Sequence, residues 1–446
     1  MATADGDRRP DSRRLLESRR LLESRRLLES TCRQEYGRIV SVLCRALGSL
    51  DEAEDVVQAA CARALESWPD RGLPSSPGAW LTTVARRIAL DQLRRARRGR
   101  AAVERASVDP SVRTTAEEPD PFDLLASWPD ERLRLIFAVC HPAIDPDARL
   151  ALTLREVCGL TTGQIAAAFL VRETTMAQRI VRAKRRLRNA GVDFADPGPE
   201  AFPTRIEDVL RVLYLLFNEG YLAAGSASLL RSELCDEAVR LARLVVSLLD
   251  ERPGGASPEA LGLLALLALS HARRDARADE NGLPVLLERQ DRTRWREDEA
   301  AGALATLDRA VAMRRPGPYQ IKAAINAIHH AASSALETDW SEILALYDRL
   351  LTFEPTSVVR LNRAVALGMV HGPQAALEEI AAVEASGGLD RYPYLYLARA
   401  RFLEDAGDIA GAGTSLAAAL ESSENEAERR FIAAEIRRLG TNASFP

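Results

Sequence analysis

The sequence has few aromatic residues and few histidines, and its cysteines are scattered. Aromatic side chains make up 5% of the 446 residues, and there are five histidines and six cysteines. The cysteines stand at positions 32, 44, 61, 140, 158 and 235, with neither CxxC nor Cys/His ligand spacing. The sequence therefore predicts no metal site, no cofactor and no disulfide framework, and free thiols fit a reducing compartment.

Signatures of enzymes and of membrane insertion are also missing. The chain has no GxxxxGK[ST] phosphate loop, no HExxH motif and no GxSxG motif. It shows no signal peptide, and no uncharged run reaches the roughly 18 residues that could span a bilayer. We therefore expect a cytoplasmic protein that makes no membrane contact and is not an enzyme.

The sequence is instead rich in helix-forming residues, and its charge is unevenly distributed. Alanine, leucine and arginine dominate, while β-branched runs are scarce, which predicts an all-α fold. The net charge of −4 divides into +7 for residues 1–190 and −11 for the remainder. This split indicates that the first half is the part that meets nucleic acid.

Breaks in the helical pattern divide the chain into six segments. SRRLLE occurs three times within residues 12–29, and because a period of six does not fit a helix, we expect a frayed, charged arm there. The predicted segments are the low-complexity N-terminal arm 1–30, a helical block 31–98, a linker 99–120, a second block 121–190, a second linker 191–204 and a helical C-terminal domain 205–446.

Two helices are predicted in the first block after the initial one. Ser49 and Glu52 form a capping box, and the helix that follows should end at Trp68, before Pro69. Its core-facing residues should be Val56, Val57, Ala60 and Ala64. Ser76-Pro77 is a helix start signal and predicts a long helix to about Arg98.

A helix-turn-helix motif is predicted at residues 159–188. Gly159 should end one helix, Thr161 and Gln164 should form a capping box, and residues 170–172 should form the turn. The first helix should bury Ile165, Ala168 and Phe169, and the second should bury Met176, Ile180, Ala183 and Leu187. The opposite face of the second helix carries short polar groups and then guanidinium groups, as DNA recognition requires: Thr175, Gln178, Arg179, Arg182 and Arg186.

The two blocks together resemble extracytoplasmic-function sigma factors of the sigma-70 family. LGSLDEAEDVVQAACARALESWP and PGAWLTTVARRIALDQLRRARR resemble the second region of that family, and residues 131–188 resemble the fourth. The resemblance implies that core RNA polymerase and promoter DNA are the partners. It also implies that the protein initiates transcription by melting promoters.

The resemblance implies a role for three sets of residues. Helix 51–66 would dock on core polymerase through Asp51, Glu54, Asp55 and Gln58. The −10 element would be read by Trp80, Arg87, Asp91, Arg94 and Arg95, although a tryptophan in a small helical domain is more often a core residue. The −35 element would be read by Thr174, Thr175, Gln178, Arg179, Arg182, Lys184 and Arg186.

In the C-terminal half, YLLFNEGY (214–221), RLNRAVAL (360–367) and NEAERRF (425–431) resemble the tetratricopeptide-like extension of one sigma-factor subgroup. Its units recur every 34–36 residues or so, with small packing residues at Ala364, Ala376, Ala400 and Ala412. Such arrays bind peptides or proteins, and Asn218, Glu219 and Tyr221 form a candidate site. The alternative for these polar residues is capping or pairing between packed helices, and the same holds for Asp291, Arg292, Arg294 and Trp295.

Two other functions remain open on the sequence alone. A one-component regulator would combine the helix-turn-helix with a peptide-sensing repeat domain, and would bind DNA without polymerase. A scaffold with a vestigial helix-turn-helix would show little salt-dependent DNA binding. The acidic helix 51–66 and the arginine-rich helix from Pro77 favour the sigma factor over both.

Overall fold

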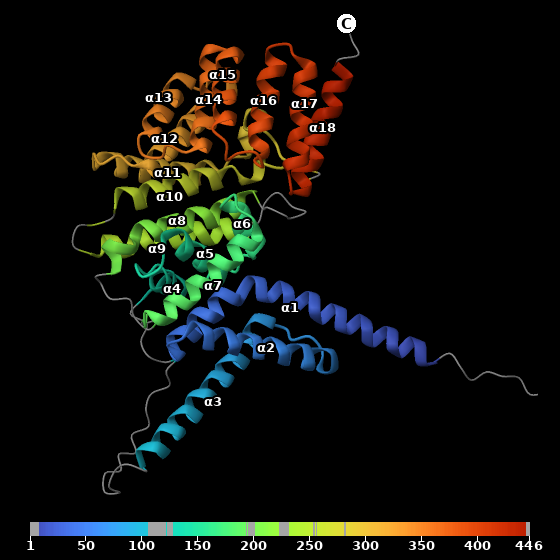
Figure 1. The fold of residues 1–446 in the computed structure, drawn as a ribbon, viewed down its shortest axis with the longest axis vertical. Helices are drawn as coiled ribbons and strands as arrows, with labels where there is room; N and C mark the ends of the chain where they lie inside the picture. Colours follow the sequence, from blue (N-terminus) through green and yellow to red (C-terminus); the bar gives the residue numbers. More distant parts are fainter. Residues whose placement is uncertain are drawn as a thin grey trace, which may run out of the picture. The chain divides into compact units, whose positions relative to one another are not determined.

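The fold was analysed in a computed structural model, which describes residues 9–105, 122, 128–192, 194, 201–222, 232–252, 255, 257–280 and 282–442. These residues contain α-helices, short 3-10 helices and one isolated β-bridge between Ala278 and Pro284, so the predicted all-α fold is confirmed. The chain forms two compact units (Figure 1). Unit 1 comprises residues 1–162 and 176–209, and unit 2 comprises residues 163–175 and 210–446.

Three helices form the first domain of unit 1: α1 (Arg9–Leu47), α2 (Leu50–Arg71) and α3 (Pro77–Arg105). The Ser49 side chain caps α2 by accepting a hydrogen bond from the Glu52 amide at 3.3 Å, as predicted. The four core-facing residues predicted on α2 are all buried. Trp68, which is 2% exposed, completes this core beside Leu81 and Ala85 of α3.

Helix boundaries in this domain differ from the sequence expectation at three places. The SRRLLE repeats are not a frayed arm, because α1 runs through them without a break, and Ser24 and Leu28 are buried. Leucine, arginine and glutamate are strong helix formers at any period. Helix α2 continues past Pro69 to Arg71, and α3 extends to Arg105, inside the segment predicted as a linker.

The second domain of unit 1 contains α4 (Glu131–Val139), α5 (Pro146–Glu156) and the larger part of α7 (Glu173–Asn189). Helix α4 is buried on every side, since all residues from Leu133 to Val139 are buried. Phe202 stacks on Trp128, with ring centroids 5.1 Å apart, and it also contacts Phe137. Because α8 begins at Ala201, the second predicted linker ends four residues earlier than expected.

Unit 2 includes most of α6 (Thr162–Ala168) and a layer of longer helices. Helix α10 (Pro258–Ala272) is buried along almost its whole length, and α9, α11 and α12 pack against it. The bounds of the elements in this layer are α8 (Ala201–Leu222), α9 (Ser232–Asp250), η1 (Arg274–Ala276), η2 (Leu287–Arg289), η3 (Arg292–Arg294), α11 (Glu297–Ala312), α12 (Pro318–Ala331) and η4 (Ala335–Glu337).

Helical hairpins form the remainder of unit 2, coloured orange to red in Figure 1. Their elements are α13 (Trp340–Leu351), α14 (Ser357–His371), α15 (Pro373–Ala385), α16 (Pro393–Asp405), α17 (Ile409–Ser422) and α18 (Glu426–Asn442). The predicted small packing residues Ala364, Ala376, Ala400 and Ala412 are all buried in this array. Among the described residues, no helix is both long and apolar enough to cross a membrane.

The space around two helical glycines predicts opposite effects of replacing each with alanine. An alanine Cβ at Gly368 would lie 2.4 Å from the Phe402 ring and 2.6 Å from the Ala376 Cβ. Gly368→Ala should therefore destabilise the array by about 1–3 kcal/mol. Gly413 lies within helix α17 and has open space around it. Gly413→Ala should therefore stabilise the array by at most about 1 kcal/mol.

Denaturant unfolding of the two variants beside the parent chain measures both effects. Stabilisation by both alanines would contradict the close approach of α14 and α16.

Candidate nucleic-acid interface

Helix α7 exposes the polar face that the sequence predicts. Its buried face consists of Met176, Ile180, Ala183 and Leu187, as expected. The opposite face exposes Thr174, Thr175, Gln178, Arg182 and Arg186. Leu170 occupies the predicted turn with a positive φ of 52°, and α7 begins at Glu173. In α6, Ile165 is buried as predicted, but Ala168 is exposed and Ala166 is buried in its place.

Two of the arginines on this face are held by acidic residues at the start of α5. Arg179 lies 3.4 Å from an Asp147 carboxylate oxygen, and Arg186 forms an ion pair with Asp145. Asp145 and Asp147 are both exposed, so these ion pairs are weak and exchange readily for other anions. Phosphate groups carry the same kind of charge as these carboxylates.

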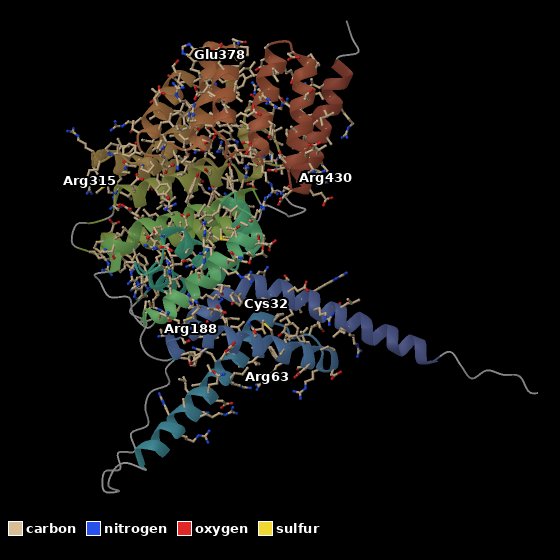
Figure 2. The ribbon with its side chains drawn as sticks, in the orientation of Figure 1. Cys32, Arg63, Arg188, Arg315, Glu378 and Arg430 are labelled. Carbon is tan, nitrogen blue, oxygen red and sulfur yellow. The ribbon has the colours of Figure 1, made fainter. Side chains whose placement is uncertain are left out.

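Lys184 does not lie on the exposed face of α7. Its ammonium lies 2.7 Å from Glu54 of α2 and 2.7 Å from Glu156 of α5, and its side chain is only 23% exposed. Near the end of the same helix, Arg188, which Figure 2 labels, forms an ion pair with Asp51 of α2, 2.7 Å away. The sequence predicts Lys184 as a DNA contact and Asp51 and Glu54 as polymerase contacts. The structure instead pairs Lys184 with Glu54 and Asp51 with Arg188.

The carboxyl group of Glu54 lies in an unusual electrostatic environment. Burial and the neighbouring Glu156 carboxylate raise the pKa of Glu54 to about 7, against the opposing effect of Lys184. The Glu156 side chain is 3% exposed and accepts a further hydrogen bond from the Tyr36 hydroxyl of α1 at 3.2 Å. One lysine therefore stabilises two partly or fully buried carboxyl groups.

The remaining predicted docking residues lie on the open side of α2. Asp55 and Gln58 are exposed, whereas Asp51 and Glu54 are half-buried. The four residues predicted to dock on polymerase thus divide into two that are accessible and two that are paired with α7.

Helix α3 presents the residues predicted to read the −10 element. Arg87, Asp91, Arg94 and Arg95 are exposed, and Asp91 lies 3.8 Å from Arg94. Trp80 is half-buried, and its ring meets the edge of the Trp68 ring with centroids 5.5 Å apart. Trp80 therefore has a packing role while its side chain remains partly exposed.

Contacts between α1 and the second domain were not predicted. The buried Arg134 guanidinium of α4 donates to the Ser41 carbonyl oxygen at 2.8 Å, and Arg45 lies 3.1 Å from Glu131. At Gly37 the two backbones approach so closely that a Cβ would lie 1.7 Å from the Val157 carbonyl oxygen. No sequence motif marks these residues, because each acts through a tertiary contact.

The candidate residues of the C-terminal unit contact other side chains of that unit. Glu219 is 6% exposed and accepts a hydrogen bond from the Gln164 amide of α6 at 2.7 Å. The Arg277 guanidinium lies 3.2 Å from the centre of the Tyr221 ring, and Asn218 is half-buried. These contacts favour packing roles for Glu219 and Tyr221.

The second polar cluster of this unit also has packing contacts. Asp291 caps η3 by accepting a hydrogen bond from the Thr293 amide, and Trp295 is 7% exposed. The Arg292 guanidinium lies 4.6 Å from the centre of the Trp295 ring and donates to the His329 carbonyl oxygen. Among the described residues, no group of three or more histidines, cysteines or carboxylates could hold a metal ion.

Comparison with known families matches three segments of the chain. Residues 32–99 match Sigma-70 region 2, residues 134–187 match Sigma-70 region 4, and residues 205–311 match a family of unknown function, DUF6596. The first segment covers the second part of α1, all of α2 and most of α3, and the second covers α5, α6 and most of α4 and α7. No solved structure gives a significant match.

Curated relatives are similar over different parts of the chain. An uncharacterised protein of Rhizobium meliloti is 42% identical over 401 residues, which is 90% of this chain and 93% of that protein. The ECF RNA polymerase sigma factor SigJ of Mycobacterium tuberculosis is 30% identical over 33% of this chain and 46% of its own. The ECF RNA polymerase sigma factor SigE of Mycolicibacterium smegmatis is 29% identical over 35% of this chain and 58% of its own. The matches to these two sigma factors thus span about half of their lengths.

The raised pKa of Glu54 predicts a pH-dependent stability of unit 1. A carboxyl group with a higher pKa in the folded chain binds its proton more tightly there, so this stabilisation is lost as the pH rises from 4.5 to about 7. The side chain in Glu54→Gln cannot ionise. Between about pH 5 and about pH 8, the free energy of unfolding of this variant should therefore fall by about 2 kcal/mol less than that of the parent chain.

Thermal unfolding across that pH range measures the difference. Asp55→Asn, at an exposed position of the same helix, is the matched control and should follow the parent chain. An unchanged pH profile for Glu54→Gln would contradict the assignment.

Proposed function

Since the chain belongs to the extracytoplasmic-function group of the sigma-70 family and carries a helical C-terminal extension, we propose that it directs core RNA polymerase to specific promoters and helps to melt them. The observation that carries this proposal is the joint presence of two matched regions with suitable exposed faces. Helix α7 offers polar and guanidinium groups, and α3 offers a row of arginines beside a half-open tryptophan ring.

The chemistry of each face supports a separate task. Thr174, Thr175 and Gln178 lie in the first two turns of α7, where short polar groups and amides reach base edges in the major groove. Arg182 and Arg186 follow, and guanidinium groups bind backbone phosphates. We assign −35 recognition to this face and −10 recognition to Arg87, Arg94 and Arg95 of α3, which suit the phosphates of a separated strand.

Polymerase docking is assigned to the acidic face of α2. Asp55 and Gln58 are accessible for this role, while Asp51 and Glu54 are engaged by Arg188 and Lys184. In the described conformation, two of the four residues assigned to docking are therefore covered by α7, the helix assigned to DNA recognition. We propose that this closed conformation opens when the protein binds polymerase, and that the fraction of open chains limits the apparent affinity.

The C-terminal unit is proposed to modulate the activity or to bind a protein partner. Support comes from its helical-hairpin architecture, which in other proteins presents a surface to peptides. The contacts of Glu219 and Tyr221 favour packing roles for those residues, so the partner surface should be sought elsewhere on the unit.

Two pairs of substitutions test whether DNA recognition and polymerase docking use separate faces. Arg179→Ala with Arg182→Ala should abolish −35 recognition, because it removes two phosphate contacts, and should leave polymerase affinity unchanged. Asp55→Ala with Gln58→Ala should weaken polymerase binding by roughly tenfold or more and spare DNA binding, since a few interface residues carry most of the affinity. Polymerase pull-down and promoter-directed transcription measure the two steps.

The same experiment separates the alternative functions. Impairment of the same step by both pairs would refute the assignment of separate faces. Sequence-specific DNA binding without any polymerase binding would instead identify a one-component regulator.

Gly37→Ala tests whether the closed conformation obstructs docking. The added Cβ cannot fit against the Val157 carbonyl oxygen, while alanine favours the α1 helix itself by about 1 kcal/mol. The variant should therefore open the contact without unfolding the first domain. Its affinity for core polymerase should rise by roughly tenfold, the equivalent of about 1.4 kcal/mol.

Amide hydrogen exchange near Val157 and Tyr36 reports the opening, and a polymerase titration reports the affinity. Gly413→Ala serves as the control for a glycine-to-alanine change and should alter neither. Faster exchange without tighter binding would show that the contact does not obstruct docking.

A further inference from the structure

Two cysteines that lie 29 positions apart in the sequence meet between α1 and α2. The Cys32 and Cys61 sulfur atoms are 3.2 Å apart, and both residues are partly exposed. Figure 2 labels Cys32 on α1. Their spacing in the sequence gives no sign of this contact, which arises from the antiparallel packing of the two helices. By contrast, Cys44, Cys140 and Cys235 are buried.

The surroundings of the pair leave room for the sulfur atoms to move. A disulfide bond requires a sulfur–sulfur distance of about 2.05 Å, so the two atoms must approach by about 1.2 Å. A small cavity adjoins Cys32 and is also lined by Tyr36, Val57 and Leu81. This space lets the Cys32 side chain change its rotamer without unfolding either helix.

The two sulfur atoms also differ in chemical character. The hydrogen bond between the two thiols lowers the pKa of Cys61, whereas the same hydrogen bond, burial and the charge of Cys61 raise the pKa of Cys32. Because the thiolate is the nucleophile, this difference favours Cys61 as the residue that reacts first. This is the arrangement of a reactive cysteine beside a resolving cysteine.

We propose that Cys32 and Cys61 form a reversible oxidation site that a hydroperoxide converts into an intramolecular disulfide. The Cys61 thiolate attacks the terminal oxygen of the hydroperoxide, the O–O bond breaks, and the released alkoxide takes up a proton to leave as an alcohol, or as water from hydrogen peroxide. Cys61 becomes a sulfenic acid. The Cys32 sulfur then attacks the Cys61 sulfur, the S–S bond forms, and the hydroxyl group leaves as water with the proton of Cys32.

The position of the pair links it to the surface of α2. Glu54, Gln58 and Cys61 are spaced four and then three residues apart, so they share one face of the helix. On α1, Cys32 precedes Tyr36 by one turn, and Tyr36 contacts Glu156. The disulfide would therefore form at the edge of the face that we assign to polymerase docking. Its formation does not depend on that assignment, and the test below does not use polymerase.

Hydrogen peroxide added to the full reduced chain tests the proposal. The treated chain should lose two hydrogen atoms in mass and two titratable thiols, and a proteolytic peptide pair containing Cys32 and Cys61 should appear. Dithiothreitol should reverse all three changes. The cross-link should raise the unfolding temperature of the first domain, because it closes a chain segment of about 30 residues.

Three single variants provide the controls. Cys32→Ser and Cys61→Ser should form no cross-linked peptide, and Cys32→Ser should accumulate a sulfenic acid at Cys61, which a dimedone probe traps. Cys158→Ser, at a partly exposed cysteine after α5, should behave as the parent chain. A parent chain that is oxidised at Cys61 without a cross-link to Cys32, or that cross-links other cysteines first, would overturn the proposal.

Discussion

The ammonium group of Lys184 is the contact on which the arrangement of unit 1 depends. It lies between the carboxyl groups of Glu54 and Glu156, one from each of the two matched sigma regions. Two carboxylates this close cannot both ionise without a cation, and burial makes the charged forms still less favourable. Both effects raise the pKa of Glu54. Such a buried network contributes little net stability, but it fixes which surfaces meet, because an incorrect register would leave a buried charge without its partner.

The backbone contacts around this network require the same register. Gly37 lets α1 approach the end of α5, and the Arg134 guanidinium, which is 2% exposed, satisfies a carbonyl oxygen of α1. Helix α4 is buried on all sides from Leu133 to Val139, and α1 provides part of its cover. Polar and apolar contacts therefore favour one closed pairing of the domains. The acidic face of α2 and the basic helix α7 are consequently coupled rather than independent.

Local signals explain which parts of this picture could be predicted from the sequence. The capping role of Ser49, the helix start at Pro77 and the buried stripe from Met176 to Leu187 depend on residues within one or two turns of each other. Lys184 was assigned to DNA because it follows a basic stripe, yet it lies on the side of α7 that faces Glu54. Its direction depends on where α2 lies, and helical periodicity carries no information about that.

The same limit applies to the ends of helices and to the cysteines. The period of six in SRRLLE suggested an irregular arm, but the residues themselves favour helix, and burial of Ser24 and Leu28 anchors the segment in α1. Pro69 suggested a helix end, but it lies in the final turn of α2, where Gly72 closes the helix with a φ of 87° and a hydrogen bond to the Trp68 carbonyl oxygen. Cys32 and Cys61 share no motif and meet only because two helices pack antiparallel.

The C-terminal extension is more closely connected to the helix-turn-helix than a tethered domain would be. Residues 163–175, which include most of α6 and the turn, belong to the same compact unit as the extension. Within that unit Glu219 is buried, and it accepts a hydrogen bond from Gln164 of α6. A buried carboxylate without such a donor is costly, so α8 and α6 stabilise each other. A displacement of α8 would therefore break this hydrogen bond and leave the Glu219 carboxyl group without the Gln164 donor.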